Sequence, residues 1–182
     1  MPAKRTHLKR SLDSRSVKAL ALGAAMMVGT AAGAVAAEPG TSGLPVPRFV
    51  SLKADKVNVR NGPNRDQDVA WVFNRAGLPV EVTAEYETWR RIRDADGAEG
   101  WVYHSMLSLR RTALVAPWLK GETVPLRGSA DADAKVVAKL EPSVLGVVKA
   151  CDGKFCRITG DGFDGYVQQN QLFGVYPGEK VD

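Results

Sequence analysis

The chain has 182 residues, of which 25 are Lys or Arg, 20 are Asp or Glu and two are Cys, giving a formal net charge of +5 at pH 7. Residues 1–37 contain six of the basic residues and one of the acidic residues, so residues 38–182 hold 19 of each and are formally neutral. A neutral chain lacks the sustained basic surface that nucleic-acid binding needs, so we expect no nucleic-acid partner.

Residues 1–37 have the pattern of a secretory signal peptide. A basic segment precedes the uncharged run from Ala19 to Ala37, which ends in the small residues that suit a cleavage site. The alternative is a single membrane anchor, which is disfavoured because the run is rich in Ala and Gly and poor in Leu. We therefore expect an exported protein, periplasmic or extracellular, without a stable membrane anchor after cleavage.

Residues 38–49 are rich in Pro and Gly and predict an extended leader. Pro45 and Pro47 favour a simple tether to the first folded domain. The alternative is that this segment occupies a groove on the chain's own surface.

The remaining chain contains one pattern twice, at separations of 65 to 67 residues. The matched pairs are Val57-Asn-Val-Arg60 with Val124-Pro-Leu-Arg127, Trp89-Arg-Arg-Ile92 with Phe155-Cys-Arg-Ile158, and Gly100-Trp-Val102 with Gly165-Tyr-Val167. Apolar and polar residues alternate between turn sequences, which predicts short strands, and no helical stripe is convincing. We predict an all-β protein with two small barrels in tandem, residues 50–110 and 121–176, a short linker at 111–120 and a tail at 177–182. The connection contains little Gly or Ser, so we expect the two barrels to be docked.

Cys151 and Cys156 flank Asp152-Gly153, a strong hairpin signal, and we predict a disulfide across this hairpin. An exported chain meets an oxidising compartment, and a domain of about 60 residues gains from such a link. A redox-active pair is disfavoured because the spacing is not Cys-x-x-Cys, and no neighbouring His or Cys suggests a metal site.

The segment Val57-Asn-Val-Arg-Asn-Gly-Pro63, followed by Trp89-Arg-Arg-Ile92 and Gly100-Trp-Val-Tyr103, resembles the bacterial SH3-like (SH3b) domains. The second copy resembles them more loosely, because Val124-Pro-Leu-Arg-Gly-Ser129 departs from the Asn and Pro of the motif. The resemblance implies small barrels on exported proteins, which generally bind cell-wall peptidoglycan or peptides. Many such domains accompany wall-cleaving hydrolases, and no sequence of that kind is present in this chain.

Strand parity predicts a binding surface on the first copy. If Ile92 and Val102 point into the core, the alternate residues of both strands point outward. The predicted ligand-binding residues are Tyr86, Trp89, Arg91, Arg93, Trp101 and Tyr103. The aromatic rings can stack on sugars or extended peptides, and the arginines can pair with carboxylates. The alternative is that the rings cover the end of the barrel or the docked second domain.

The second copy carries Phe155, Tyr166 and Gln168 at the matching positions, which predicts a weaker surface. Arg60 and Arg127 also match, which favours a structural salt bridge within each barrel over ligand contact.

The sequence shows no arrangement typical of catalysis. His104 is the only histidine of residues 38–182, and its neighbour Ser105 would point to the opposite face of a strand. We therefore predict a non-catalytic protein without cofactor or metal, which binds peptidoglycan or its stem peptides through the first copy. The alternatives are an adaptor that docks an envelope enzyme or a proline-rich partner, and a structural subunit without a ligand.

Overall fold

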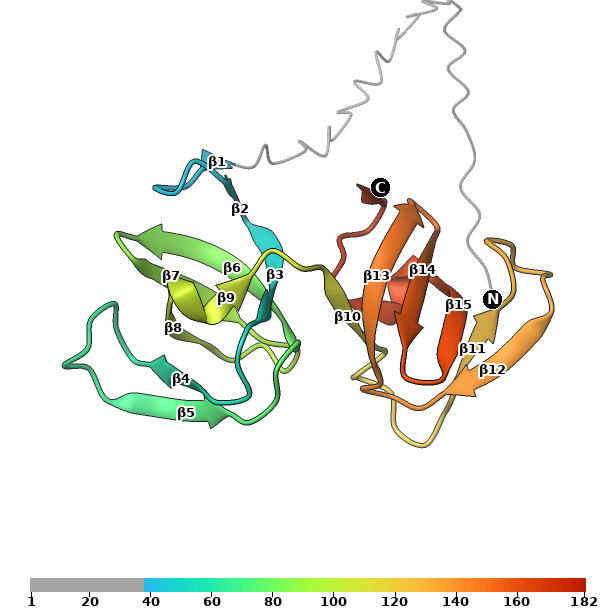
Figure 1. Ribbon diagram of the computed structural model, residues 1–182, viewed down its shortest axis with the longest axis horizontal. Coiled ribbons are helices and arrows are strands. Elements are labelled where there is room, and N and C mark those ends of the chain that lie inside the picture. The colour runs from blue at the N-terminus through green and yellow to red at the C-terminus, as the bar shows by residue number, and fades with distance from the viewer. Residues whose placement is uncertain (1–37) are drawn as a thin grey trace, which may run out of the picture. The chain divides into compact units, whose positions relative to one another are not determined.

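The computed structural model describes residues 38–182, and the predicted signal peptide lies outside the described residues (Figure 1). This part of the chain is all-β, apart from two single-turn 3-10 helices, η1 (His104–Met106) and η2 (Gln169–Gln171). No helix among residues 38–182 is long and apolar enough to cross a membrane.

The first barrel is a sheet of seven antiparallel strands, drawn from blue to yellow in Figure 1. Its strand order is β5 (Val69–Phe73), β4 (Val57–Arg60), β8 (Glu99–Tyr103), β7 (Trp89–Arg93), β6 (Pro79–Tyr86), β3 (Arg48–Leu52) and β9 (Leu107–Ser108). The buried core consists of Val50, Leu52, Val57, Val59, Val80, Val82, Ile92 and Val102, with Trp71 packed against it. The alternating valines of the sequence therefore form the core of the barrel.

The second barrel repeats this topology, strand for strand. Its order is β12 (Val136–Leu140), β11 (Val124–Arg127), β15 (Phe163–Gln168), β14 (Phe155–Gly160), β13 (Leu145–Asp152), β10 (Thr112–Val115) and β16 (Leu172–Phe173), with β17 (Lys180–Val181) beside β13. The register shifts also recur, between Val59 and Arg60 in the first copy and between Leu126 and Arg127 in the second. The predicted pair of small barrels is thus confirmed, and the duplication extends to the irregularities of the strands.

The boundary between the barrels differs from the expected one. Thr112–Val115, in the segment expected to be a linker, forms β10 and pairs with both β13 and β16. All four of its residues are buried, so the sequence lacks the alternation that marks a strand with one exposed face. The expected tail also contributes a strand, because Lys180–Val181 pairs with β13.

The predicted disulfide between Cys151 and Cys156 is present and joins β13 to β14. Asp152 shapes the turn between them, since its Oδ1 accepts 2.7 Å hydrogen bonds from the backbone N–H groups of Lys154 and Phe155. Gly153 adopts φ = 98°, a conformation that favours glycine. The Asp-Gly pair therefore makes the tight turn that brings the two cysteines opposite each other.

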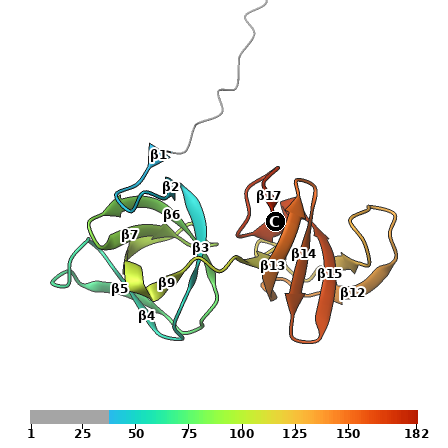
Figure 2. The same cartoon turned by 45° about the horizontal axis from the view of Figure 1, so that its top comes forward.

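The leader is fixed to the first barrel. Glu38–Pro39 (β1) and Pro45–Val46 (β2) form a small ladder, and Figures 1 and 2 both show it beside β6. The residues that follow, from Arg48 onward, continue directly into β3. The leader is thus more than a simple tether.

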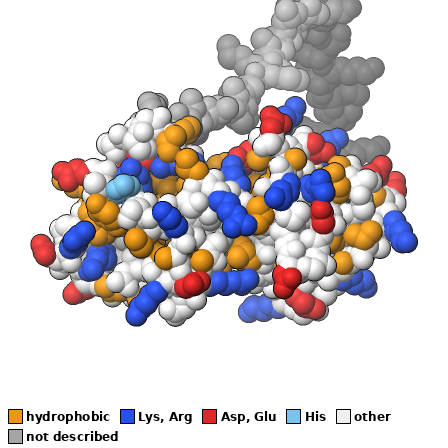
Figure 3. Space-filling view, viewed as in Figure 1, with side chains coloured by type: hydrophobic (Ala, Val, Ile, Leu, Met, Phe, Trp, Pro, Cys, Tyr) orange, Lys and Arg blue, Asp and Glu red, His pale blue; other side chains and the backbone are white. Residues whose placement is uncertain are grey.

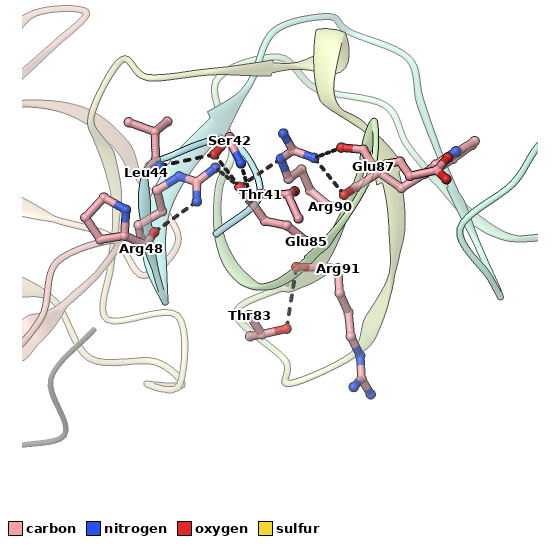
Figure 4. Close-up of polar contacts among 11 residues, drawn as sticks. Thr41, Ser42, Leu44, Arg48, Thr83, Glu85, Glu87, Arg90 and Arg91 are labelled. Atoms are coloured by element: carbon pink, nitrogen blue, oxygen red, sulfur yellow. Dashed lines mark hydrogen bonds and ion pairs between the residues drawn. The ribbon is translucent and has the colours of Figure 1, made fainter. Parts of the chain in front are cut away.

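Glu85 of β6 fastens the turn of the leader (Figure 4). Its carboxylate accepts hydrogen bonds from Thr41 Oγ1 at 3.1 Å and from the Ser42 backbone N–H and hydroxyl, each at 2.7 Å. It also forms ion pairs with Arg48 at 2.7 Å and Arg90 at 3.0 Å, and its side chain is 1% exposed. Burial opposes ionisation, but the hydrogen bonds from Ser42 and Arg48 and the charge of Arg90 outweigh it and lower the pKa of Glu85 to about 2.

The two barrels contact each other through aromatic rings and through side-chain hydrogen bonds. The Phe49 ring lies 5.2 Å from that of Phe173 and 4.8 Å from that of Tyr176, centroid to centroid. Thr112 Oγ1 donates a 2.7 Å hydrogen bond to the carbonyl of Gly77. These contacts agree with the docking expected from the Gly-poor connection.

Candidate functional site

Two of the predicted site residues, Trp89 and Tyr103, lie directly opposite each other on β7 and β8. Their rings meet edge to face with centroids 5.6 Å apart. Ile92 and Val102 are fully buried in the core cluster of the first barrel, and neither Trp89 nor Tyr103 belongs to that cluster. Trp89 is nevertheless 7% exposed, so only part of its ring reaches the surface.

Trp89 and Tyr103 form one wall of a groove of about 500 Å³ in the first barrel. The groove is lined by Lys56, Asn58, Arg60, Arg65, Trp89, Tyr103 and Met106. Its other wall comes from β4 and from the loop that joins β4 to β5. We call it the first groove.

Arg65 lies in that loop, with its guanidinium carbon 5.6 Å from the centre of the Tyr103 ring. This distance is within the range of a cation–π interaction, which holds the cation beside the ring. The loop itself is ordered by Asn64, whose Oδ1 accepts 3.0 Å hydrogen bonds from the backbone N–H groups of Asp66 and Gln67. The first groove therefore has one cation beside the Tyr103 ring and a second aromatic ring, that of Trp89, in contact with Tyr103.

Arg60 holds the end of the loop, because its Nη1 donates a 2.6 Å hydrogen bond to the carbonyl of Gln67. Arg127 makes the matching bond, 2.8 Å long, to the carbonyl of Ala134. The structural role expected for both arginines is present, but each guanidinium binds a backbone carbonyl where we expected a salt bridge. We call each of these bonds the loop latch.

The other predicted residues lie outside the first groove. Arg91 pairs with Glu99 at 2.6 Å, and Arg93 pairs with Glu81, whose hydrogen bond raises the pKa of Arg93. Trp101 lies opposite Arg91 on the neighbouring strand and is half-buried, whereas Tyr86 lies opposite Trp89 and is 52% exposed. None of these four side chains lines the groove.

The residues that the sequence did not indicate are Lys56, Asn58, Arg65 and Met106. Arg65 lies in an irregular loop, where strand parity gives no direction for a side chain. Met106 lies in η1, which ends the strand pattern that began at Glu99. The part that Arg65 takes in the lining of the groove depends on how its loop folds toward Tyr103, and the spacing of residues in the sequence does not reveal that fold.

The second barrel has a groove of about 350 Å³ at the matching place. It is lined by Ala132, Gly153, Lys154, Phe155, Gln168, Gln169, Asn170, Pro177 and Gly178. Ala132 stands at the position of Arg65, and Gln168 stands at that of Tyr103. We call it the second groove, and it lacks the cation and the ring that meet in the first.

The rings that touch between the barrels are Phe49, Phe173 and Tyr176. Trp89 and Tyr103 take no part in these ring contacts and open instead into the first groove. The alternative that the second domain covers this aromatic pair therefore does not hold.

Among residues 38–182, no group of three or more His, Cys, Asp or Glu side chains is arranged to hold a metal ion. Both cysteines are joined in the disulfide, so neither thiol is free in this structure. His104 lies against Tyr103, with ring centroids 4.9 Å apart. On the face shown in Figure 3, basic, acidic and hydrophobic side chains are interspersed over both barrels.

A family model described as Bacterial SH3 domain matches residues 53–108 and, a second time, residues 120–174. The chain belongs to the bacterial SH3 domain family. Each matched region covers most of one barrel, so the protein is a tandem pair of bacterial SH3 domains, and each domain carries one of the two grooves. No curated protein matches the chain.

Several solved structures resemble this pair of bacterial SH3 domains. NlpC2 and NlpC1 of Trichomonas vaginalis match 70% and 75% of the chain, at 10% and 11% identity, each with a TM-score of 0.32. The chain spans about half of their length, 48% in both cases. A structure described as Endolysin LysPBC5 CBD matches 75% of the chain and 96% of its own length, at 16% identity and a TM-score of 0.28.

Proposed function

We propose that this tandem of bacterial SH3 domains is an exported, non-catalytic protein that binds the cell wall. The proposed ligand is peptidoglycan or its stem peptides, and the proposed site is the first groove. The observation that carries the proposal is the arrangement of Trp89, Tyr103 and Arg65, an aromatic pair with a cation held beside it. Family membership supports it, because bacterial SH3-like domains generally bind peptidoglycan or peptides.

The chemistry of the first groove suits a sugar–peptide polymer. An exposed part of an aromatic ring offers a flat apolar surface to the face of a sugar or to an extended backbone. The side chains of Asn58, Arg65 and Lys56 offer hydrogen-bond donors on the opposite side. We further propose that Tyr86, Trp101, Arg91 and Arg93 make flanking contacts with a ligand that extends past the groove.

Co-sedimentation of residues 38–182 with purified peptidoglycan sacculi across a salt series tests the proposal. We expect saturable binding that Tyr103→Ala reduces about tenfold, since the contact of a ligand with one aromatic ring contributes on the order of 1 kcal/mol beyond the apolar area that it buries. Trp118→Ala is the matched control, because Trp118 is 55% exposed and lines neither groove. Equal loss in both variants, or no sedimentation of the parent protein, contradicts the proposal.

The same assay separates wall binding from an adaptor role. A wall-binding protein sediments with sacculi that carry no other protein. An adaptor for an envelope enzyme or a proline-rich partner sediments only when that partner is added. Sedimentation that depends on an added envelope fraction would therefore replace the proposed function with the adaptor role.

A further inference from the structure

The first groove carries positive charge that its own lining does not neutralise. Lys56, Arg60 and Arg65 line it, and no Asp or Glu belongs to the lining among the described residues. A cation without a protein partner in a partly enclosed groove attracts an anionic group from solution.

Four other arginines of the same barrel have carboxylate partners, whereas Arg60 binds a backbone carbonyl and Arg75 lies outside the groove. Arg48 and Arg90 share Glu85, while Arg91 pairs with Glu99 and Arg93 with Glu81 (Figure 4 shows the first two). Within residues 38–182, Arg65 makes no hydrogen bond or ion pair through its side chain. Its five N–H donors therefore stay available, and its position is defined by the Tyr103 ring instead.

A guanidinium group with free donors binds a carboxylate more strongly than it binds a neutral ligand group. Its planar fork can donate two parallel hydrogen bonds to the two oxygens, and such charge-assisted bonds are about twice as strong as neutral ones. Because the Tyr103 ring already restrains Arg65, less side-chain freedom is lost when the carboxylate binds. The same ring offers a surface for the apolar part of the ligand.

The second groove differs in this respect. Its lining contains one cation, Lys154, and replaces Arg65 with Ala132. Gln168 and Asn170 contribute neutral amide groups, which pair with carbonyls and hydroxyls as readily as with carboxylates. The duplicated domains therefore present two grooves of the same position and different chemistry.

We propose that the first groove selects ligands with a free carboxylate, which Arg65 binds beside Tyr103, and that the second groove has no such preference. This inference rests on the proposed function and specifies which part of a stem peptide the first groove recognises.

An NMR titration of residues 38–182 tests the selectivity with two probes. One is a stem tripeptide with all carboxylates free, and the other is the same peptide with each carboxylate converted to the carboxamide. We expect the free acid to shift the amide signals of residues 61–68 with an affinity at least about tenfold higher than that of the carboxamide, the scale of one charge-assisted interaction. Signals of residues 128–135 should not distinguish the two peptides.

Variants of one position make the assignment specific. Arg65→Gln should reduce the affinity for the free acid to that for the carboxamide, whereas Arg65→Lys should retain part of the preference because it keeps the charge without the fork. Arg75→Gln is the control, since Arg75 is an exposed arginine of the same barrel outside the groove. Unchanged signals elsewhere in each variant establish that the fold is retained.

The outcomes separate this inference from the proposed function. If both peptides bind the first groove equally, or if neither binds while sacculi still sediment the protein, the carboxylate selectivity is overturned and wall binding stands. If neither peptide binds and the sacculi do not sediment the protein, both are overturned.

Discussion

The Tyr176 hydroxyl donates a 2.9 Å hydrogen bond to Glu81 Oε1, from the second barrel to the first. The other oxygen of this buried carboxylate accepts a 2.9 Å hydrogen bond from Arg93 Nε, so both oxygens have a partner. Burial and the hydrogen bond to Glu81 raise the pKa of Tyr176. The contact between the barrels therefore includes a satisfied polar network as well as edge-to-face and tilted ring contacts.

We expect Tyr176→Phe to lower the free energy of unfolding by about 1–2 kcal/mol, because it leaves one oxygen of a buried carboxylate without its donor. The measurement is the midpoint of urea denaturation. Tyr166→Phe is the control, since the Tyr166 hydroxyl makes no hydrogen bond to another residue of the described chain. Equal midpoints for the two variants would show that the inter-barrel bond contributes nothing to stability.

The Glu85 cluster predicts a specific acid dependence. The pKa of Glu85 is about 2 in the folded protein, below its ordinary value of 4.5, so its stabilisation is complete above about pH 4.5 and is lost as the pH falls toward 2. By linkage this contribution is at most about 3 kcal/mol at neutral pH. Chemical denaturation of Glu85→Gln from pH 7 to pH 2 should show a smaller decline in stability than the parent protein shows. A parallel decline in both proteins would contradict the role of Glu85.

Loss of the disulfide should destabilise the second barrel selectively. The link closes a short loop, and the chain-entropy estimate for such a loop is about 2 kcal/mol. We expect the double variant Cys151→Ser, Cys156→Ser to show earlier loss of amide-exchange protection in residues 112–175 than in residues 48–108. Uniform loss across both barrels would instead indicate that they unfold as one cooperative unit.

The two grooves can be made alike by transfer of two side chains. The double variant Ala132→Arg, Gln168→Tyr places a cation and a ring in the second groove, at the positions that Arg65 and Tyr103 occupy in the first. We expect the shifts of the amide signals of residues 128–135 to report an affinity for the free-acid peptide about tenfold higher than that for its carboxamide. Each single variant serves as a control, because the cation lacks its restraining ring or the ring lacks its cation.

The duplication and most strands could be predicted because alternating residues report burial on one face of a strand. Val57 and Val59 are fully buried and flank the exposed Asn58, which is the pattern that the sequence contains. Thr112–Val115 is buried at every position, so its pattern contains no alternation and its strand was not anticipated. Short strands without periodicity depend on pairing partners that lie far away in the sequence.

The candidate site was predictable only in part, for the same reason. Trp89 and Tyr103 lie on strands, where parity fixes the direction of a side chain relative to Ile92 and Val102. Arg65 acquires its place from a loop closed by Asn64 and Arg60, and the partners of Arg91 and Arg93 come from neighbouring strands. Residue type and spacing show which side chains are available, and the three-dimensional fold decides which of them are already paired.

The loop latch also bears on how such a protein diversifies. Arg60 and Arg127 each bind a carbonyl seven residues ahead, although five of the six intervening residues differ between the copies. Because the anchor uses a backbone oxygen, it imposes no demand on the side chains that the loop displays. Outside Asn64 and Asp131, whose side chains order the two loops, substitutions between the arginine and its carbonyl can therefore change what one groove presents while the loop latch is kept.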